Sequence, residues 1–142
     1  LGARITYAYT KEQLAKDKDG NSINNQYIPA REHALNVRMD YDRQISSNYG
    51  LNIGLQGRVL SGVENVEYKD YYDVSKGTIS VEYPAYTLWK LSLVQRIGKA
   101  VKVNAALDNL FGYKPKYYYL NSPITDGVTF QIGVSIDIDK FF

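Results

Sequence analysis

Tyrosine is the residue type in this sequence with the clearest capacity to bind a ligand. The chain of 142 residues has 14 tyrosines, and two groups of them stand in long polar segments: Tyr71 with Tyr72, and the triple Tyr117, Tyr118 and Tyr119. Aromatic rings in such positions stack on flat ligands such as haem or a sugar ring. Aromatic side chains also anchor proteins at a membrane surface. Ligand binding and anchoring therefore both remain open for these five residues.

Other chemistry is poorly supported. The sequence has no cysteine and one histidine, His33, and it has no Gly-x-Ser-x-Gly segment that would present a serine nucleophile. The run Asp17-x-Asp19-x-Asn21 begins like a calcium-binding loop but lacks the glycine and the glutamate that such a loop needs further on. We expect no metal site, no cofactor and no enzymatic activity. A hydrolase built on His33 remains the weaker alternative.

Length and charge narrow the class of protein further. A chain of 142 residues suits a single domain, and 17 Lys and Arg against 15 Asp and Glu leave a net charge of +2, too small for a nucleic-acid-binding surface. No stretch approaches the roughly 18 to 20 apolar residues of a membrane-spanning helix. The chain begins at Leu1 without an initiator methionine or a signal peptide, so we expect a processed or truncated piece of a longer protein.

Alternation of apolar and polar residues with a period of two dominates the sequence and predicts β-strands. It is clearest near the end of the chain, where Phe130, Ile132 and Val134 alternate with polar or small residues. Six such runs cover residues 3–9, 35–41, 49–59, 89–96, 101–108 and 128–139. The fold class is therefore all-β.

Two all-β architectures fit this alternation, a water-soluble carbohydrate-binding sandwich and a membrane barrel. The runs have about the 9 to 11 residues that a tilted strand needs to cross a bilayer. Short connections at 43–48 and 97–100 alternate with long ones at 15–28, 61–82 and 112–127. Short turns on one side and long loops on the other are typical of outer-membrane barrels. Because such barrels have at least about eight strands, six strands predict part of a larger barrel.

Several segments carry a resemblance to a known family. The segment Asn109-Leu110-Phe111 resembles a motif on the penultimate strand of TonB-dependent outer-membrane receptors, and Tyr86 to Lys99 and Pro29 to Asn36 resemble strands further upstream. The final run resembles their terminal strand with its targeting pattern, which is filled here by Gln131, Gly133, Ile136, Ile138 and the closing Phe142. The segment before the final run, 122–127, is most similar to receptors of Bacteroidetes-type bacteria.

The resemblance implies that residues 1–142 are the C-terminal six antiparallel strands of a barrel of about 22 strands, without its plug and its earlier strands. It implies import of a scarce nutrient, such as haem, a siderophore, cobalamin or a glycan, across the outer membrane of a Gram-negative bacterium. The implied partners are outer-membrane lipid, TonB acting through the plug, the barrel-assembly machinery, a surface lipoprotein and the small-molecule or glycan ligand. Charged residues expected to line the lumen are Arg38, Asp40, Arg58, Lys90, Arg96, Asp108 and Asp137.

Overall fold

A computed structural model describes residues 1–11, 18–20, 30–115, 123 and 125–140. In this part of the chain, regular structure consists of eight β-strands and two short 3₁₀ turns. The strands are β1 (Gly2–Tyr9), β2 (His33–Ser46), β3 (Tyr49–Leu60), β4 (Val63–Tyr68), β5 (Thr78–Tyr83), β6 (Tyr86–Ile97), β7 (Val101–Asp108) and β8 (Thr129–Ile136), and the 3₁₀ turns are η1 (Val74–Lys76) and η2 (Ile138–Lys140). None of the described residues forms a helix long and apolar enough to cross a membrane.

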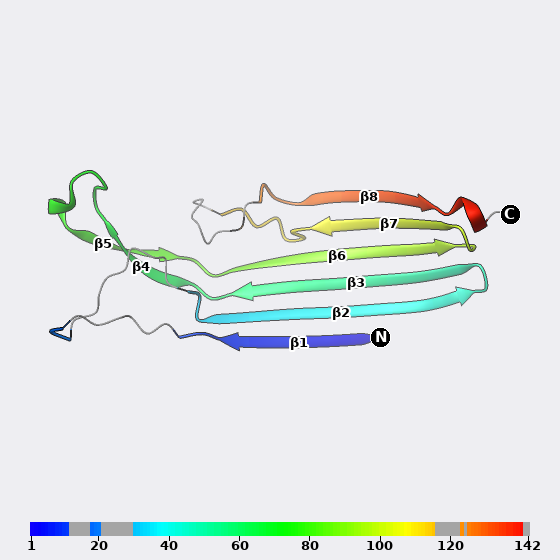
Figure 1. The fold of residues 1–142 in the computed structure, drawn as a ribbon, viewed down its shortest axis with the longest axis horizontal. Coiled ribbons are helices and arrows are strands. Elements are labelled where there is room, and N and C mark those ends of the chain that lie inside the picture. Colours follow the sequence, from blue (N-terminus) through cyan, green and yellow to red (C-terminus); the bar gives the residue numbers. More distant parts are fainter. Residues whose placement is uncertain (12–17, 21–29, 116–122, 124, 141–142) are drawn as a thin grey trace.

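Six strands form one antiparallel sheet in the order β1-β2-β3-β6-β7-β8. Short turns join β2 to β3 and β6 to β7 at one end of the sheet, and the strand ends that the long connections join lie at the other end (Figure 1). Gly98, with a φ of 62°, makes the β6–β7 turn, and its N–H donates to the carbonyl of Asn48 in the neighbouring turn at 2.7 Å. The all-β class, the six antiparallel strands and the alternation of connection lengths agree with the sequence predictions.

The structure differs from the sequence prediction at two places, the connection at 61–82 and the end of the last strand. The connection at 61–82, expected to be a loop, contains strands β4 and β5, which pair as a separate hairpin beyond the main sheet. Strand β5 has an apolar row, Ile79, Val81 and Tyr83, but β4 places Asn65 and Glu67 beside it and turns Val66 to the other face, so neither face of the hairpin is uniformly apolar. The final run also ends early, because β8 stops at Ile136 and Ile138 lies in η2.

The two faces of the six-stranded sheet differ sharply in polarity. Paired residues of neighbouring strands share a face, so the register places the apolar rows of all six runs on one side. On β8 this row is Phe130, Ile132, Val134 and Ile136, which are 60, 68, 62 and 59% exposed. Among the described residues, the buried apolar side chains are few, namely Leu60, Tyr83, Ala100 and Pro115. The sheet therefore has no conventional core, and no described element covers its apolar face.

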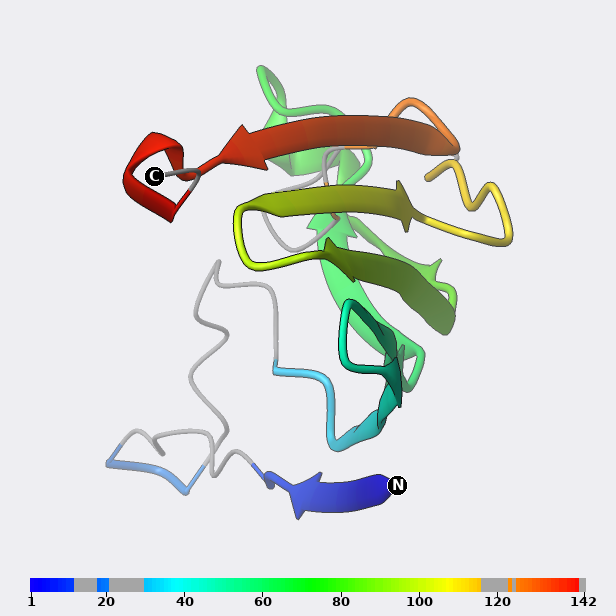
Figure 2. The same ribbon diagram turned by 90° about the vertical axis from the view of Figure 1, so that its right-hand side faces the viewer.

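The sheet is curved, and the strands follow an arc when they are viewed from the end with the short turns (Figure 2). A hollow of about 800 Å³ lies mainly among side chains of the polar face, so this face is the concave one. On the apolar face, the ring of Trp89 covers its cross-strand partner Gly57, where a Cβ atom would lie 2.5 Å from the ring carbons. Glycine in a strand commonly marks such close packing, and the aromatic ring replaces its missing side chain.

Candidate functional site: the polar hollow and the end of the sheet with the long connections

The polar face carries most of the charged residues that were expected to line a lumen. The register places six of them on this one side: Arg38, Asp40, Arg58, Lys90, Arg96 and Asp108. The seventh, Asp137, lies past the end of β8, where its backbone N–H donates to the carbonyl of Ala100 at 2.8 Å. The alternation places the six on one face, but it does not show how their charges are paired.

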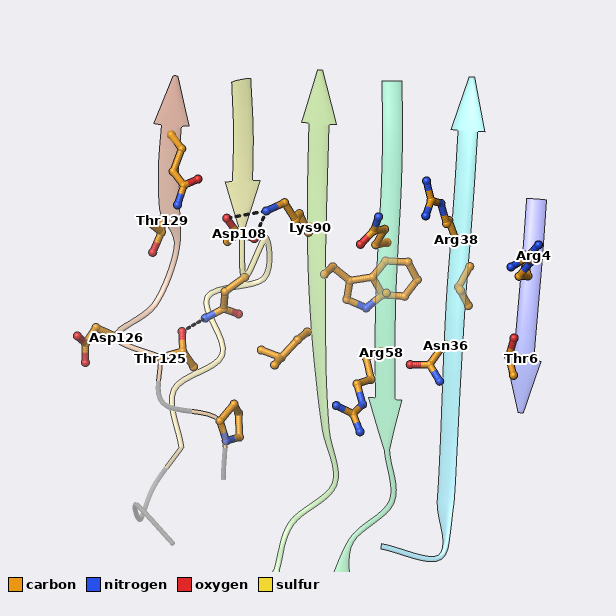
Figure 3. A pocket seen from close by; sticks show the side chains of 18 residues that line it. Arg4, Thr6, Asn36, Arg38, Arg58, Lys90, Asp108, Thr125, Asp126 and Thr129 are labelled. Atoms are coloured by element: carbon orange, nitrogen blue, oxygen red, sulfur yellow. Dashed lines mark hydrogen bonds and ion pairs between the residues drawn. The ribbon is translucent and has the colours of Figure 1, made fainter. Parts of the chain in front are cut away.

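Three ion pairs neutralise much of the charge on this face. Arg38 contacts Asp40 on the same strand at 2.7 Å, and Lys90 on β6 contacts Asp108 on β7 at 3.0 Å, as Figure 3 shows for the second pair. Because both pairs are partly exposed to solvent, which screens their attraction, each contributes little to stability. Their effect is mainly to fix side-chain positions around the hollow.

A third ion pair crosses a whole strand. The guanidinium of Arg96 on β6 contacts the carboxylate of Asp42 on β2 at 2.7 Å, although β3 lies between them. Gly50 of β3 makes room for this crossing, since a Cβ atom there would lie 2.8 Å from Nε of Arg96. Gly54, two positions along the same face, similarly makes room for the hydroxyl of Ser92, which donates to the carbonyl of Gly54 at 3.3 Å. These glycines therefore set the shape of the polar face.

Asn109 organises the chain after β7. It is 8% exposed and has a φ of 53°, in the left-handed region that asparagine tolerates better than most residues. Its side-chain amide donates to the carbonyl of Tyr113 at 2.7 Å and to the hydroxyl of Thr125 at 2.9 Å, and its Oδ1 accepts from the N–H of Tyr113 at 2.9 Å. The bond to Thr125 is drawn in Figure 3. Asn109 thereby ties the loop after β7 to the segment that leads into β8.

The other two residues of the Asn-Leu-Phe segment continue the contact with β6. The N–H of Leu110 donates to the carbonyl of Trp89 at 2.8 Å. The ring of Phe111 lies edge-on to the Trp89 indole, with centroids 6.1 Å apart, and Phe111 is otherwise largely exposed. The three residues thus turn the chain, extend the strand pairing and add an aromatic ring beside Trp89.

An ordered tip presents the tyrosine pair of the long connection. Tyr71 and Tyr72 are 83 and 96% exposed, with their rings edge-to-face at 5.7 Å between centroids. Asp70 accepts from the N–H of Tyr72 at 3.0 Å and from Nζ of Lys76 at 2.6 Å, and Asp73 caps η1. The bond from Lys76, followed by that from Tyr72, holds the pKa of Asp70 below its ordinary value of 3.8. The second tyrosine group, at 117–119, lies outside the described residues.

The positions of the terminal pattern are divided between the faces. Gln131 and Gly133 lie on the polar face, opposite Ala106 and Asn104 of β7, whereas Ile136 lies on the apolar face. Ile138 is exposed in η2 rather than in the strand. Phe142 lies outside the described residues.

An aromatic cluster at the end with the long connections was not singled out as a site from the sequence. The guanidinium of Arg31 lies 4.7 Å from the ring centroid of Tyr86, donates to the carbonyls of Ser61 and Pro84, and so joins three segments. Tyr86 stacks on Tyr113 with centroids 5.2 Å apart. Burial raises the pKa of Tyr113 above its ordinary value of 10.0, and nearby Arg31 opposes this shift. The sequence signal was limited to tyrosines near predicted strand ends.

The imidazole of His33 lies beside two tyrosine rings, and the backbone N–H of His33 donates to the hydroxyl of Ser61 at 3.2 Å. The hydroxyl of Tyr7 lies 2.7 Å from Nδ1 of His33, and the rings of Tyr7 and Tyr9 lie 6.0 and 5.2 Å from the imidazole. Among the described residues, no group of three or more His, Cys, Asp or Glu side chains is arranged to hold a metal ion. The arrangement gives His33 a structural role at the start of β2.

Comparison with known proteins gives one match. The family model described as TonB dependent receptor-like, beta-barrel matches residues 1–110. Neither the curated proteins nor the solved structures include a match to this chain. The family match covers five of the six strands of the main sheet, which are β1, β2, β3, β6 and β7.

Proposed function

The chain belongs to the TonB dependent receptor-like β-barrel family, and on that premise we propose that it forms part of a receptor that imports a scarce nutrient. Membership of this family supports TonB-dependent transport at the outer membrane. The proposed cargo is haem, a siderophore, cobalamin or a glycan. The proposed energy source is TonB, which would act through a plug enclosed by the complete barrel.

The observation that supports this proposal most strongly is the separation of the two faces. The convex face is largely apolar, with Arg43 and Gln95 on it near the end with the short turns, and the concave face carries the ion pairs and the hollow. A lysine or arginine facing lipid near the bilayer midplane costs roughly 2 to 4 kcal/mol. A sheet with most of its charges on the concave side, and with Arg43 of the convex face near the end of its strand, is therefore suited to lipid outside and water inside.

This separation also argues against the alternative of a soluble carbohydrate-binding sandwich. In a sandwich, the apolar face of one sheet packs against a second sheet about 10 Å away. No second sheet lies over the apolar face within the described ranges, since β4 and β5 extend beyond the end of the main sheet (Figure 1).

We propose that the nutrient first meets the tyrosines at the outer end. Tyr71 and Tyr72 project from a hairpin whose tip is held by Asp70 and Asp73, so their rings are presented without a large loss of entropy on binding. The tyrosines at 117–119 are proposed to take part as well. Replacing both Tyr71 and Tyr72 with Ala should weaken binding of the cargo about tenfold, whereas Tyr68→Ala on strand β4 should leave it nearly unchanged.

The remaining partners are proposed from the same premise. Outer-membrane lipid would cover the convex face, and the barrel-assembly machinery would recognise the terminal pattern that ends in Ile136, Ile138 and Phe142. A surface lipoprotein would cap the outer end of the barrel. The charged residues of the concave face would line the lumen and face the plug.

Uptake measurements test the proposal. The gene for the full-length receptor is deleted, and growth is measured with haem, a siderophore, cobalamin or a glycan as the limiting nutrient, with and without functional TonB. We expect loss of growth on one of the four, restored by the wild-type gene only in cells that have TonB. Unchanged growth on all four nutrients, or restoration that is independent of TonB, would contradict it.

A further inference from the structure

The hollow of the polar face has a cationic wall. Arg4 of β1, Arg38 of β2 and Arg58 of β3 all line it, together with Thr6 and Asn36. The register pairs Arg4 with Arg38 and Arg58 with Asn36, so the three guanidinium groups come from one continuous patch across three strands. Figure 3 shows these side chains on one half of the hollow.

Two of these three arginines have no counter-charge. Arg38 is paired with Asp40 at 2.7 Å, but Arg4 and Arg58 make no ion pair or side-chain hydrogen bond with any described residue. The opposite wall has two carboxylates. That of Asp108 is already paired with Lys90, and that of Asp126 lies at the far side of the hollow from Arg4 (Figure 3) and makes no ion pair with Arg4 or Arg58. The wall formed by β1, β2 and β3 thus keeps two unneutralised positive charges.

Unpaired guanidinium groups on this wall are unfavourable unless something neutralises them. Arg4 lies directly opposite Arg38 on the neighbouring strand, where like charges destabilise a sheet, and the one carboxylate beside them, Asp40, forms its ion pair with Arg38 and not with Arg4. A guanidinium stays charged at all physiological pH values, so the repulsion cannot be relieved by losing a proton. An anion held between the arginines would relieve it.

The chemistry of the wall matches a carboxylate or a phosphate. Arginine presents its N–H donors as a planar fork that suits these two groups, and Asn36 and Thr6 add an amide and a hydroxyl beside it. A volume of about 800 Å³ is within the roughly 300 to 1,000 Å³ of typical small-molecule sites. We infer that the hollow binds an anionic group, a carboxylate or a phosphate, of the imported solute through Arg4 and Arg58. This inference rests on the proposed transport function.

Equilibrium dialysis of the full-length receptor in detergent tests the inference, with radiolabelled inorganic phosphate and radiolabelled citrate as separate probes at low ionic strength. We expect saturable binding of at least one probe, weakened at least tenfold in Arg58→Gln and in Arg4→Gln. Lys102→Gln is the matched control, because Lys102 is an exposed cation on the same face that does not line the hollow. It should change the affinity less than twofold. Resistance of each variant to unfolding in SDS shows that its barrel is intact.

Each outcome of the dialysis experiment either supports or refutes the anion site. Binding of phosphate alone or citrate alone supports the site and identifies which anion it prefers. Absence of binding of both probes to the wild-type receptor would overturn the inference, as expected if a carboxylate of the receptor itself already fills the wall. Equal weakening by Lys102→Gln and Arg58→Gln would also overturn it, because it indicates nonspecific attraction.

Uptake by cells separates this inference from the transport proposal. If wild-type uptake requires TonB but the Arg4→Gln, Arg58→Gln double variant imports the nutrient at the wild-type rate, the anion site is refuted and transport stands. If wild-type uptake does not require TonB, the transport proposal fails. The dialysis result then still decides whether the hollow binds an anion.

Discussion

Replacing Asn109 should loosen the connection between β7 and β8. The side chain makes three hydrogen bonds, two with the backbone of Tyr113 and one with Thr125, while it is almost fully buried. At about 1 kcal/mol for each bond, Asn109→Gly should lower the free energy of local opening by about 3 kcal/mol. Asn109→Ala should lower it by about 1 kcal/mol more, because alanine is disfavoured at a φ of 53°.

Hydrogen exchange measured by mass spectrometry on the full-length receptor in detergent reports this opening. The amide of Tyr113 donates to Oδ1 of Asn109, so its exchange should accelerate roughly 150-fold in Asn109→Gly and roughly 1,000-fold in Asn109→Ala. Asn104→Ala is the control, because Asn104 is exposed on β7 and makes no side-chain hydrogen bond with a described residue.

Comparing the exchange rates of the glycine and alanine variants separates the loss of the side-chain hydrogen bonds from the backbone strain that alanine adds at a positive φ. Equal exchange in the glycine and alanine variants would refute the contribution of the backbone conformation. Exchange within threefold of wild type in both variants, or no faster than in Asn104→Ala, would refute the hydrogen-bonded connection itself.

Three further predictions follow from other parts of the molecule. Gly57→Ala should lower the free energy of unfolding of the barrel, measured by urea titration, by about 1 to 3 kcal/mol, because the new Cβ would lie 2.5 Å from the Trp89 ring. In a Trp89→Ala background the same substitution should cause no such loss of stability. Folding lowers the pKa of Asp70, so the ionised carboxylate stabilises the hairpin tip above pH 3.8, and this stabilisation is lost as the pH falls through the lower pKa of the folded state. Amide exchange at the tip should therefore accelerate in the wild type as the pH falls through that folded-state pKa. The Asp70→Asn variant should show no such acceleration. Ile136→Asp places a charge on the apolar face and should reduce outer-membrane abundance of the full-length receptor; normal abundance on immunoblots of membrane fractions would contradict this.

Much of the fold could be predicted from the sequence, because the polarity of each strand residue indicates whether its side chain lies on the apolar or the polar face of the sheet. Each apolar row must face one phase and each polar row the other, so alternation alone placed residues such as Arg38 and Lys90 on a common face. The hairpin of β4 and β5 escaped prediction because its strands are short and neither face is uniformly apolar. The end of β8 at Ile136 was also missed, since alternation continues into η2 although strand pairing stops.

The candidate site was less predictable than the fold. The sequence marked Asn109 as part of a motif, but its bond to Thr125 depends on two segments that meet only in space. Arg4 falls on the polar side of the run at 3–9, but its type and position in the sequence do not mark it as part of a site. The stacking of Tyr86 on Tyr113 likewise joins separate elements of the chain.

The sequence by itself determined which side of each strand meets an apolar phase, because side chains alternate strictly along a strand and need no partner to do so. Only the tertiary structure decided which charges neutralise one another, because pairing depends on register and on the space between strands. Arg96 reaches Asp42 across β3 because Gly50 leaves room for it, whereas Arg58 lies opposite Asn36 and has no acid among the described residues. Coulomb attraction acts over a few ångströms of space, and distance along the chain does not reveal it.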